Sequence, residues 1–277
     1  YRLEKFERIP PKEIHNYYSK LKKSSCDKRF ISKSLFKCQP DFFSKFIAHY
    51  INISFEDGIF PSILKKSKIL PVHKCNSKLI ISNYRPIAIN SSLSKVFEKT
   101  VYKQLNEYLK KNDMLYNLQF GFTSRKSSGT AFIYIISRII ELQKNHNVAI
   151  IFLDFSKAFD SICHQRIIRK LHDCYGIRGT ALDLLKSYLT DRMQYVTINS
   201  AESRCRAVNF GVPQRSILGP LLFRIFIDDL YLFIKDDAEL ILYADDAALI
   251  IHGNSWNNVK DKCNKNLVYI HQYCLKK

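Results

Sequence analysis

The chain has 277 residues, of which 46% are hydrophobic and 25% are charged. These values are typical of globular proteins and exclude a disordered chain, and no apolar run reaches the ~20 residues of a membrane-spanning helix. The 44 Lys and Arg residues outnumber the 25 Asp and Glu residues, so the net charge is +19. Such a charge favours a nucleic-acid partner, although a basic surface that aids solubility or binds acidic membranes is an alternative.

The eight cysteines are scattered, without a Cys-x-x-Cys pair or the Cys/His spacing of a zinc site. Scattered cysteines are typical of a reduced intracellular protein. We therefore expect a location in the nucleus, the cytoplasm or both. The chain begins at Tyr1 and shows no signal peptide, which indicates a segment of a longer polypeptide.

The first half of the chain shows helical periodicity in three places. Apolar residues recur every three to four positions and predict helices over residues 38–60, 94–109 and 131–142. Residues 1–126 are also rich in Lys and Arg, many of them between the apolar segments. The acidic residues of interest lie farther along, in the middle of the chain. This division suits an enzyme whose basic region binds one anion and whose acidic region positions metal ions on another.

The second half of the chain mixes strand and helix signals. The apolar run 148–153 predicts a fully buried strand over residues 147–155. Two short β-prone runs, 240–244 and 247–251, predict a hairpin whose two-residue loop is Asp245–Asp246. The remaining signals predict helices over 161–175, 180–189 and 257–273, a helix that opens at Gly219–Pro220, and a hairpin of 195–198 with 204–208. Together they predict an α+β fold, with a small antiparallel sheet and helices packed on one side.

Three aspartates fall at the ends of these predicted strands. Asp154 follows six apolar residues, where an uncompensated carboxylate is costly to bury, and Asp245 and Asp246 occupy the hairpin tip. If both elements lie in one sheet, the carboxylates converge and repel one another unless cations bind. Two Mg²⁺ ions about 3.5–4 Å apart are the usual arrangement in polymerases. Each feature alone has a simpler explanation, since an Asp-Asp turn is usually a solvated tip and a lone Asp after a strand is often a helix cap.

The residues around these aspartates resemble the palm motifs of reverse transcriptases from non-LTR (LINE-type) retrotransposons, with the jockey-like branch the nearest. The first matching segment is Phe-Leu-Asp-Phe-Ser-Lys-Ala-Phe-Asp at 152–160, with His164 beyond it. The second is Gly-Val-Pro-Gln-Arg-Ser-Ile-Leu-Gly-Pro-Leu-Leu-Phe at 211–223, which continues to 227–230. The third is Tyr-Ala-Asp-Asp at 243–246. Two fingers motifs precede them in the family's order: Asn-Tyr-Arg-Pro-Ile at 83–87 with Lys95 and Glu98, and Gln-Phe-Gly-Phe at 119–122 with Ser127 and Ala131. The resemblance spans nearly the whole chain.

The resemblance implies the fingers and palm of a right-hand polymerase, with residues 1–146 as fingers with an N-terminal extension and 147–277 as palm. It implies an RNA-directed DNA polymerase that adds dNTPs to a DNA primer on an RNA template. The chain would end before the family's next palm motif, primer grip, thumb and endonuclease domain. A viral RNA-dependent RNA polymerase is disfavoured by Tyr-Ala-Asp-Asp and by an aromatic residue at Phe159. A group II intron-type enzyme shares the palm chemistry, but segment 214–223 resembles the LINE-type form.

The resemblance also implies roles for single residues near the metal ions. Asp154, Asp245 and Asp246 would be the catalytic ligands of two Mg²⁺ ions, for which Mn²⁺ is a substitute. Phe155 would add its backbone carbonyl to the second metal. Phe159 would lie under the incoming sugar, where a rigid ring clashes with a ribose 2′-OH and so selects deoxynucleotides; a core Phe is the alternative.

Further residues would contact the nucleotide or hold the motifs together. Gln214 would touch the incoming sugar or the template base. Lys74, Lys78 and Arg85 would clamp the triphosphate, whose charge requires cations, although any single Lys is more often a solvated surface charge. We expect hydrogen bonds within the palm from Asp160 and His164, and a structural role for the pair Asp228 and Asp229.

Two residues depart from the family pattern. Arg215 replaces a Gly in Pro-Gln-Gly-Ser, and Gly is used where the backbone has a positive φ or approaches a ligand closely. Thr123 replaces an Arg after Phe-Gly-Phe, and Arg125 and Lys126 could supply part of that charge. These departures leave an alternative open, in which the chain is a catalytically weakened or dead remnant that still binds nucleic acid.

Overall fold

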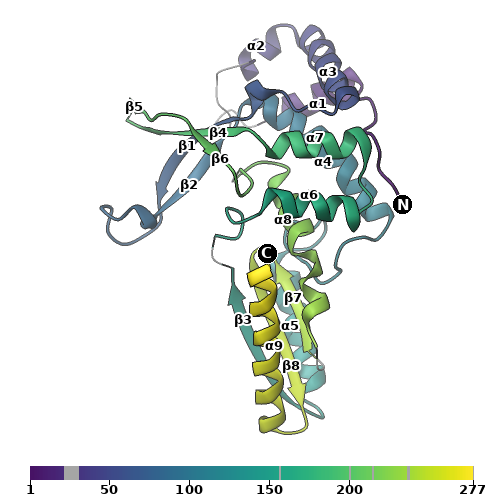
Figure 1. The fold of residues 1–277 in the computed structure, drawn as a ribbon, viewed down its shortest axis with the longest axis vertical. Coiled ribbons are helices and arrows are strands. Elements are labelled where there is room, and N and C mark those ends of the chain that lie inside the picture. The colour runs from purple at the N-terminus through teal and green to yellow at the C-terminus, as the bar shows by residue number, and fades with distance from the viewer. Residues whose placement is uncertain (22–30, 156, 200, 214, 236–237, 277) are drawn as a thin grey trace. The chain divides into compact units, whose positions relative to one another are not determined.

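The computed structural model describes residues 1–21, 31–155, 157–199, 201–213, 215–235 and 238–276 (Figure 1). The chain divides into two compact units, each made of two separate segments. The first unit comprises residues 1–113 and 159–219, and the second comprises 114–158 and 220–277. Helices and strands occur in both, so the expected α+β class is confirmed. The fingers and palm boundary at residues 146/147 remains a prediction.

The described part of the first unit contains helices and a mixed sheet. Its helices are α1 (Pro11–Lys20), α2 (Lys33–Cys38), α3 (Pro40–Asp57), α4 (Ser92–Lys111), α6 (His164–Asp173) and α7 (Gly179–Leu189), with short 3₁₀ turns η2 (Ser62–Leu64) and η3 (Ile81–Asn83). Its strands are β1 (Lys66–His73), β2 (Tyr84–Ile89), β4 (Arg192–Ile198), β5 (Ala201–Glu202) and β6 (Arg206–Val208). The predicted helices that correspond to α3, α4, α6 and α7 are confirmed.

Local signals set the ends of these helices. Gly58 ends α3 with a φ of 68°, and its backbone N–H donates to the Ser54 carbonyl, as glycine does at many helix C-termini. Ser91 caps α4 by accepting a hydrogen bond from the backbone N–H of Ser94. The predicted helix over 38–60 therefore ends three residues early, at Asp57.

The sheet of the first unit has the strand order β2-β1-β4-β5, and β6 also pairs with β4. β1 and β2 are antiparallel, whereas β1 and β4 are parallel. The predicted hairpin of 195–198 with 204–208 is confirmed only in part: β4 and β6 are antiparallel, but residues 192–194 pair with 206–208, and residues 197–198 pair with β5. The parallel pair was not expected, because the sequence predicted only one small antiparallel sheet.

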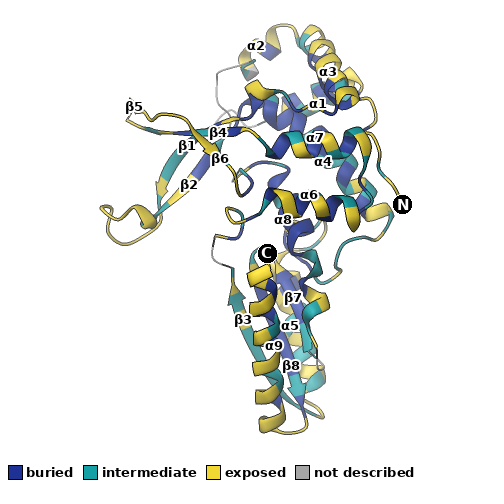
Figure 2. Cartoon of the chain, in the orientation of Figure 1, coloured by how far each residue is buried: buried dark blue, intermediate teal, exposed yellow. Residues whose placement is uncertain are grey.

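Aromatic rings join the helices of the first unit. Phe97 of α4 lies 5.8 Å from Phe55 of α3 and 4.7 Å from Phe60, measured between ring centroids. Tyr188 of α7 lies 5.1 Å from Phe60. All four side chains are buried, and α4 and α7 show dark blue, buried stretches in Figure 2. Edge-to-face pairs of this kind add to the stabilisation from burial.

The described part of the second unit holds a three-stranded antiparallel sheet. Its elements are α5 (Ser128–Leu142), β3 (Asn147–Asp154), α8 (Gly219–Ile227), the 3₁₀ helix η4 (Asp228–Phe233), β7 (Ala238–Tyr243), β8 (Asp246–Gly253) and α9 (Trp256–Lys276). The strand order is β3-β8-β7, with β8 in the centre. The predicted helices that correspond to α5, α8 and α9 are confirmed.

Helices cover both faces of this sheet, so the expected one-sided packing is wrong. Ala248 and Ile250 of β8 pack with Ala131 of α5 in one core cluster. The neighbouring residues Ala247 and Leu249 face the opposite side, because side chains alternate along a strand, and they are buried too. Helix α9 also contacts β8 and β3, and it lies in front of the sheet in Figure 1.

The burial predicted for β3 is also wrong. Most of its residues are half-buried, and Phe152 is 74% exposed. β3 is an edge strand of the described sheet and borders only β8. Among the described residues, no helix is long and apolar enough to cross a membrane.

Candidate active site

The Tyr-Ala-Asp-Asp segment forms the turn between β7 and β8. Tyr243 and Asp246 are paired across the two strands, so Ala244 and Asp245 form the two-residue loop. The predicted loop was Asp245–Asp246 and is wrong by one residue, because Asp246 is the first residue of β8. Ala244 has a φ of 57°, and this left-handed conformation costs about 1–2 kcal/mol for a residue with a side chain.

Asp154 lies opposite Asp246. Asp154 is the last residue of β3, and the antiparallel register pairs it with Asp246. Residues directly opposite in such a pair have Cβ atoms about 4.5–5.5 Å apart, so the two side chains leave the same face of the sheet. Asp245 lies in the adjoining turn. The expectation that β3 and the hairpin share one sheet is therefore confirmed.

These aspartates form a site of repelling negative charge. Partial desolvation raises the pKa of Asp246, although its side chain is largely exposed, and the charges of Asp245 and Asp154 raise it further. Asp154 and Asp246 are exposed and Asp245 is half-buried, so the costly burial expected at Asp154 is not observed. The repulsion favours a bound cation, and hard carboxylate oxygens are the donors that Mg²⁺ prefers.

The carboxylate oxygens of the three aspartates are chemically suitable ligands for a divalent metal ion, but they do not form a complete coordination sphere. Among the described residues, no group of three or more His, Cys, Asp or Glu side chains is arranged to hold a metal ion. Phe155 follows Asp154 and is half-buried; its carbonyl accepts a hydrogen bond of 3.2 Å from the backbone N–H of Ala158. That carbonyl keeps a second lone pair for another partner.

Backbone strain is concentrated in the segments that resemble the family motifs. Nine described residues other than glycine have a positive φ. Four of them lie in these segments, namely Phe122, Lys157, Arg215 and Ala244, and a fifth, Arg125, follows Gln-Phe-Gly-Phe by three residues. Strained conformations cost of order 1–3 kcal/mol each and cluster at functional sites. The strain therefore falls mainly in or beside the segments that the family resemblance had singled out.

In the first unit, the end of one motif packs against the start of another. The backbone N–H of Val212 donates to the Phe159 carbonyl over 2.9 Å. Gly211 has a φ of 78°, and a Cβ there would lie 2.7 Å from the Cα of Asp160. Gly211 therefore meets two demands that only glycine satisfies, a left-handed backbone and a close approach.

His164 ties the same two segments together. Its side chain is buried, and Nε2 lies 2.6 Å from the Gly211 carbonyl. Burial lowers the pKa of His164, so the ring is neutral near pH 7 and donates from Nε2. The expected hydrogen-bonding role of His164 is thus confirmed. Asp160 is exposed and lines the cavity described below.

Glu98 is a buried anchoring residue whose role the sequence did not reveal. Its side chain is completely buried in α4. One carboxylate oxygen accepts from the backbone N–H groups of Ile217 and Leu218 at 2.6 and 3.4 Å. The other accepts from Ser94 Oγ and Asn90 Nδ2, both at 3.2 Å. Glu98 thereby anchors Ile217 and Leu218, in the segment 215–218, to the helix that follows Asn-Tyr-Arg-Pro-Ile.

The two departures from the family pattern have different structural consequences. Arg215 has a φ of 65°, which confirms that this position takes the left-handed backbone for which glycine is suited. Thr123 Oγ1 donates to the Gln119 carbonyl over 2.9 Å. Lys126 donates to the Asn117 carbonyl. Gln214, predicted to touch the nucleotide, lies outside the described residues.

The acidic pair Asp228 and Asp229 is structural, as expected. Asp228 accepts a hydrogen bond of 2.8 Å from the backbone N–H of Tyr116. Asp229 accepts one of 2.7 Å from the hydroxyl of Tyr273 in α9. Both bonds lie within the second unit and join η4 to its neighbours.

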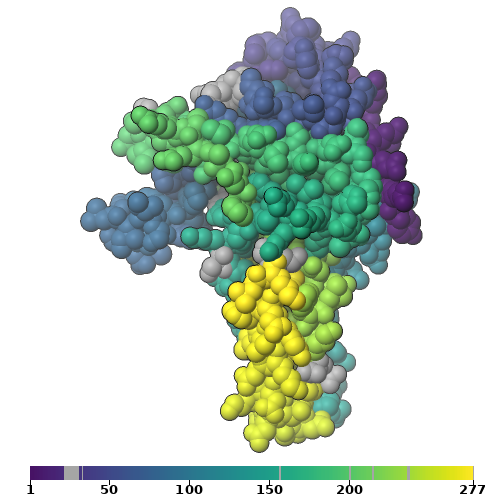
Figure 3. All heavy atoms as spheres, in the orientation of Figure 1, coloured from purple at the N-terminus to yellow at the C-terminus, as the bar shows by residue number. Residues whose placement is uncertain are grey.

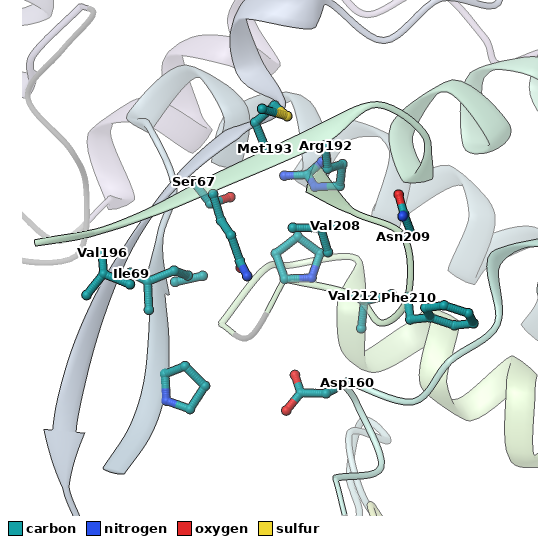
Figure 4. A pocket seen from close by; sticks show the side chains of 14 residues that line it. Ser67, Ile69, Asp160, Arg192, Met193, Val196, Val208, Asn209, Phe210 and Val212 are labelled. Carbon is teal, nitrogen blue, oxygen red and sulfur yellow. The ribbon is translucent and has the colours of Figure 1, made fainter. Parts of the chain in front are cut away.

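A cavity of about 450 Å³ in the first unit collects residues from three motif segments (Figure 4). Pro86, Asp160 and Val212 line it. Arg192 lines it as well and is 1% exposed. Its Nη1 donates to the Tyr188 carbonyl over 3.0 Å, while its Nη2 has no partner within the described part of the chain. No signal in the sequence pointed to this buried arginine.

The three predicted phosphate-clamping cations lie on one hairpin. Lys74 follows β1, Lys78 lies in the β1–β2 loop, and Arg85 is in β2 opposite Val72. All three side chains are exposed. The loop projects from the surface of its unit, in blue at the left of Figure 3. The structure thus brings these cations onto one protruding element.

The family model for reverse transcriptase (RNA-dependent DNA polymerase) matches residues 63–276. The chain is 30% identical over 237 residues to a Drosophila melanogaster protein named "Probable RNA-directed DNA polymerase from transposon BS", covering 83% of this chain and 26% of that protein. It is 25% identical over 252 residues to the RNA-directed DNA polymerase from mobile element jockey of the same species, covering 88% and 27%. The chain thus spans about a quarter of each relative, and the expected resemblance to jockey-like elements is confirmed. The family model covers most of the chain, which therefore belongs to the reverse transcriptase family.

Proposed function

We propose that this chain carries the nucleotidyl-transfer centre of an RNA-directed DNA polymerase from a non-LTR retrotransposon. One observation carries the proposal: Asp154 and Asp246 are paired across β3 and β8, with Asp245 in the adjoining turn. Membership of the reverse transcriptase family and similarity to the transposon BS and jockey proteins support it. The substrates would be dNTPs, a DNA primer and an RNA template.

Reverse transcriptases generally use divalent metals, which activate the primer 3′-OH and stabilise the leaving pyrophosphate. In this chain Asp154, Asp245 and Asp246 would hold two Mg²⁺ ions, or Mn²⁺ as a substitute, with the carbonyl of Phe155 as a further donor. The mutual repulsion of the three carboxylates supports this assignment, because a cation relieves it.

The remaining assignments concern the nucleotide. Lys74, Lys78 and Arg85 would bind the triphosphate, since they are exposed on one hairpin and oriented cations stabilise the charge that develops on pyrophosphate. Phe159 would exclude the ribose 2′-OH, and Gln214 would touch the sugar or template base. We assign residues 1–146 to the fingers and 147–277 to the palm.

Primer extension on an RNA template with Mg²⁺ and dNTPs tests the proposal. Asp154→Asn and Asp245→Asn should each reduce incorporation by at least about 10³-fold, because each removes a charged ligand from the reacting centre. Asp261→Asn is the matched control, since Asp261 is exposed on α9 in the same unit. Equal incorporation by all four proteins would refute the proposal.

A second candidate function is a weakened or inactive copy that still binds nucleic acid. The φ of 65° at Arg215 favours it, because a side chain at that position strains the motif that carries Gln214. Under this view, Arg215→Gly increases the rate of dNTP incorporation. Equally robust synthesis by Arg215→Gly and the unchanged chain would reject it.

A further inference from the structure

A short segment ahead of α5 runs beside β7 in the second unit. The backbone N–H of Phe120 donates to the Leu242 carbonyl over 2.7 Å, and the N–H of Leu242 donates to the Leu118 carbonyl over 2.9 Å. Gln119 and Leu242 thereby form a parallel bridge. The Gln-Phe-Gly-Phe segment is therefore fixed to the strand that leads into the Tyr-Ala-Asp-Asp turn.

The side chain of Gln119 continues this contact into the turn. It is 3% exposed. Its Oε1 accepts from the backbone N–H of Ala244 at 3.1 Å and from that of Gly121 at 2.8 Å. Its Nε2 is buried and has no hydrogen-bond partner within the described residues. Only the oxygen end of the carboxamide is used, and it serves two backbone donors.

Gly121 brings the segment against the same residue of the turn. A Cβ on Gly121 would lie 2.0 Å from the backbone nitrogen of Ala244 and 2.7 Å from its Cα. Real Cβ atoms do not approach a backbone so closely, so any side chain at position 121 displaces the turn. Gly121 and Gln119 thus act on one residue, Ala244, which has the left-handed φ of 57°.

A left-handed alanine needs support from its surroundings. The N–H of Ala244 is a buried donor, and leaving such a donor unsatisfied costs about 1–3 kcal/mol. The Gln119 acceptor removes that cost only while Ala244 keeps its observed conformation. The next two residues in the chain are Asp245 and Asp246, so the conformation of Ala244 sets the direction of both carboxylates.

We infer that Gln119 is a positioning residue, which fixes the Ala244–Asp245 turn through the Ala244 N–H and so places the carboxylates of Asp245 and Asp246. This inference rests on the proposed function, because it takes those two aspartates as catalytic. The family resemblance assigned Gln119 no role. Its role follows from three contacts of this structure: the Ala244 bond, the Gly121 approach and the bridge to Leu242.

Two substitutions separate the acceptor from the packing. Gln119→Met keeps the length and apolar volume of the side chain but removes the acceptor. Gln119→Glu keeps an oxygen at the same place, and it loses no hydrogen bond of Nε2 to any described residue, because Nε2 has no partner among them. Gln143→Met is the matched control, since Gln143 is exposed at the end of α5 in the same unit.

Hydrogen exchange of the Ala244 amide reports the hydrogen bond directly. In the unchanged chain the Ala244 amide should exchange as slowly as that of Leu242, whose N–H is also bonded. Gln119→Met should accelerate exchange at Ala244 at least about tenfold, because an exposed or unbonded amide exchanges without local opening. Fast exchange at Ala244 in the unchanged chain overturns the inference without any variant.

Metal binding and turnover report the placement of the carboxylates. Loss of a residue that orients metal ligands typically costs 10–100-fold in metal affinity or activity. We therefore expect Gln119→Met to weaken Mn²⁺ binding, measured by electron paramagnetic resonance, and to lower kcat for dNTP addition by about 10–100-fold. Gln119→Glu should recover both to within a few fold, and Gln143→Met should change neither. A purely structural role would lower thermal stability in both Gln119 variants without this recovery.

The outcomes separate the inference from the proposed function. If the unchanged chain and Asp245→Asn incorporate dNTPs equally, the proposed function fails, while Ala244 exchange and Mn²⁺ binding still decide the role of Gln119. The inference is overturned if the Gln119→Met variant has the same Ala244 exchange rate and the same Mn²⁺ affinity as the unchanged chain, whatever its activity. Equal losses in Gln119→Met and Gln119→Glu overturn it as well.

Discussion

The motif residues of the two units are held in opposite ways. In the first unit Glu98 and His164 are buried, and their hydrogen bonds join motif segments to one another. In the second unit Asp154 and Asp246 are exposed and lie opposite a like charge. Buried motif residues with satisfied hydrogen bonds stabilise a fold, whereas repelling carboxylates cost stability, a pattern that is typical of functional sites. Substitutions in the two sets should therefore change stability with opposite signs.

The largest effect is expected at Glu98. Glu98→Ala leaves the buried N–H groups of Ile217 and Leu218 without their acceptor, which should lower the free energy of unfolding by about 3 kcal/mol. Glu98→Gln should cost less, because one oxygen remains. Urea-induced unfolding measures both values.

The control for this prediction lies on the same helix. Glu107 is exposed on α4, so Glu107→Ala should change the free energy of unfolding by less than about 0.5 kcal/mol. If Glu98→Ala cost no more than Glu107→Ala, Glu98 would not anchor the motif and the contrast between the two units would disappear.

A smaller gain is expected at Arg215. Arg215→Gly removes the steric cost of a side chain at a φ of 65° and should raise the free energy of unfolding by about 1 kcal/mol. Arg204→Gly is a suitable control, because Arg204 is exposed and is not among the described residues with a positive φ. There the extra flexibility of glycine in the unfolded chain should bring no gain. If Arg215→Gly were less stable than the unchanged chain, the backbone at Arg215 would not be strained by its side chain.

The pH dependence of stability tests His164. Burial lowers its pKa in the folded state below the ordinary value of about 6.5, so below that pH the unfolded state binds more protons. The free energy of unfolding therefore decreases as the pH drops from about 6.5 through the folded pKa of His164. Above about pH 6.5 the ring is neutral in both states and no longer changes the stability. His164→Gln should show a smaller loss over this window.

His271→Gln provides the comparison for the pH series, because His271 is exposed on α9. Its loss of stability between pH 7 and pH 5 should match that of the unchanged chain. The same loss in His164→Gln as in the unchanged chain would show that the buried ring does not govern this response.

Much of the fold follows from local sequence signals, and the exceptions have physical causes. Helices such as α3 and α4 follow from their apolar periodicity and end at a glycine or begin at a capping serine. β1 and β2 escape such analysis because Pro71 and Pro86 interrupt their patterns and face each other in the pairing. The parallel pairing of β1 with β4 joins strands far apart in the chain, which local periodicity does not encode.

The candidate site shows the same limit at the scale of one residue. Asp is favoured in tight turns over Ala, so the sequence predicted Asp245–Asp246 as the loop. In the structure the loop is Ala244–Asp245, because Gln119 and Gly121, distant in sequence, bind and pack against Ala244. The family resemblance identified the three aspartates, but their pairing depends on the register of β3 with β8, which only the tertiary structure sets.

The smallest effect on stability is expected at Asp246, and like that of Arg215→Gly it is opposite in sign to the effect of Glu98→Ala. Asp246→Asn removes one of the repelling charges beside Asp154 and Asp245. Both partners of the cross-strand pair are exposed, so solvent weakens the repulsion and the gain in unfolding free energy should be below about 1 kcal/mol. The gain should shrink as salt rises from 0.01 M to about 1 M, because the Debye length falls from about 30 Å to about 3 Å. Added Mg²⁺ should reverse its sign, since the unchanged chain then gains a bound cation that Asp246→Asn holds poorly. Thermal unfolding at each salt concentration, with and without Mg²⁺, measures the change in stability. If Asp246→Asn were less stable than the unchanged chain in metal-free buffer, Asp246 would support the fold as Glu98 does.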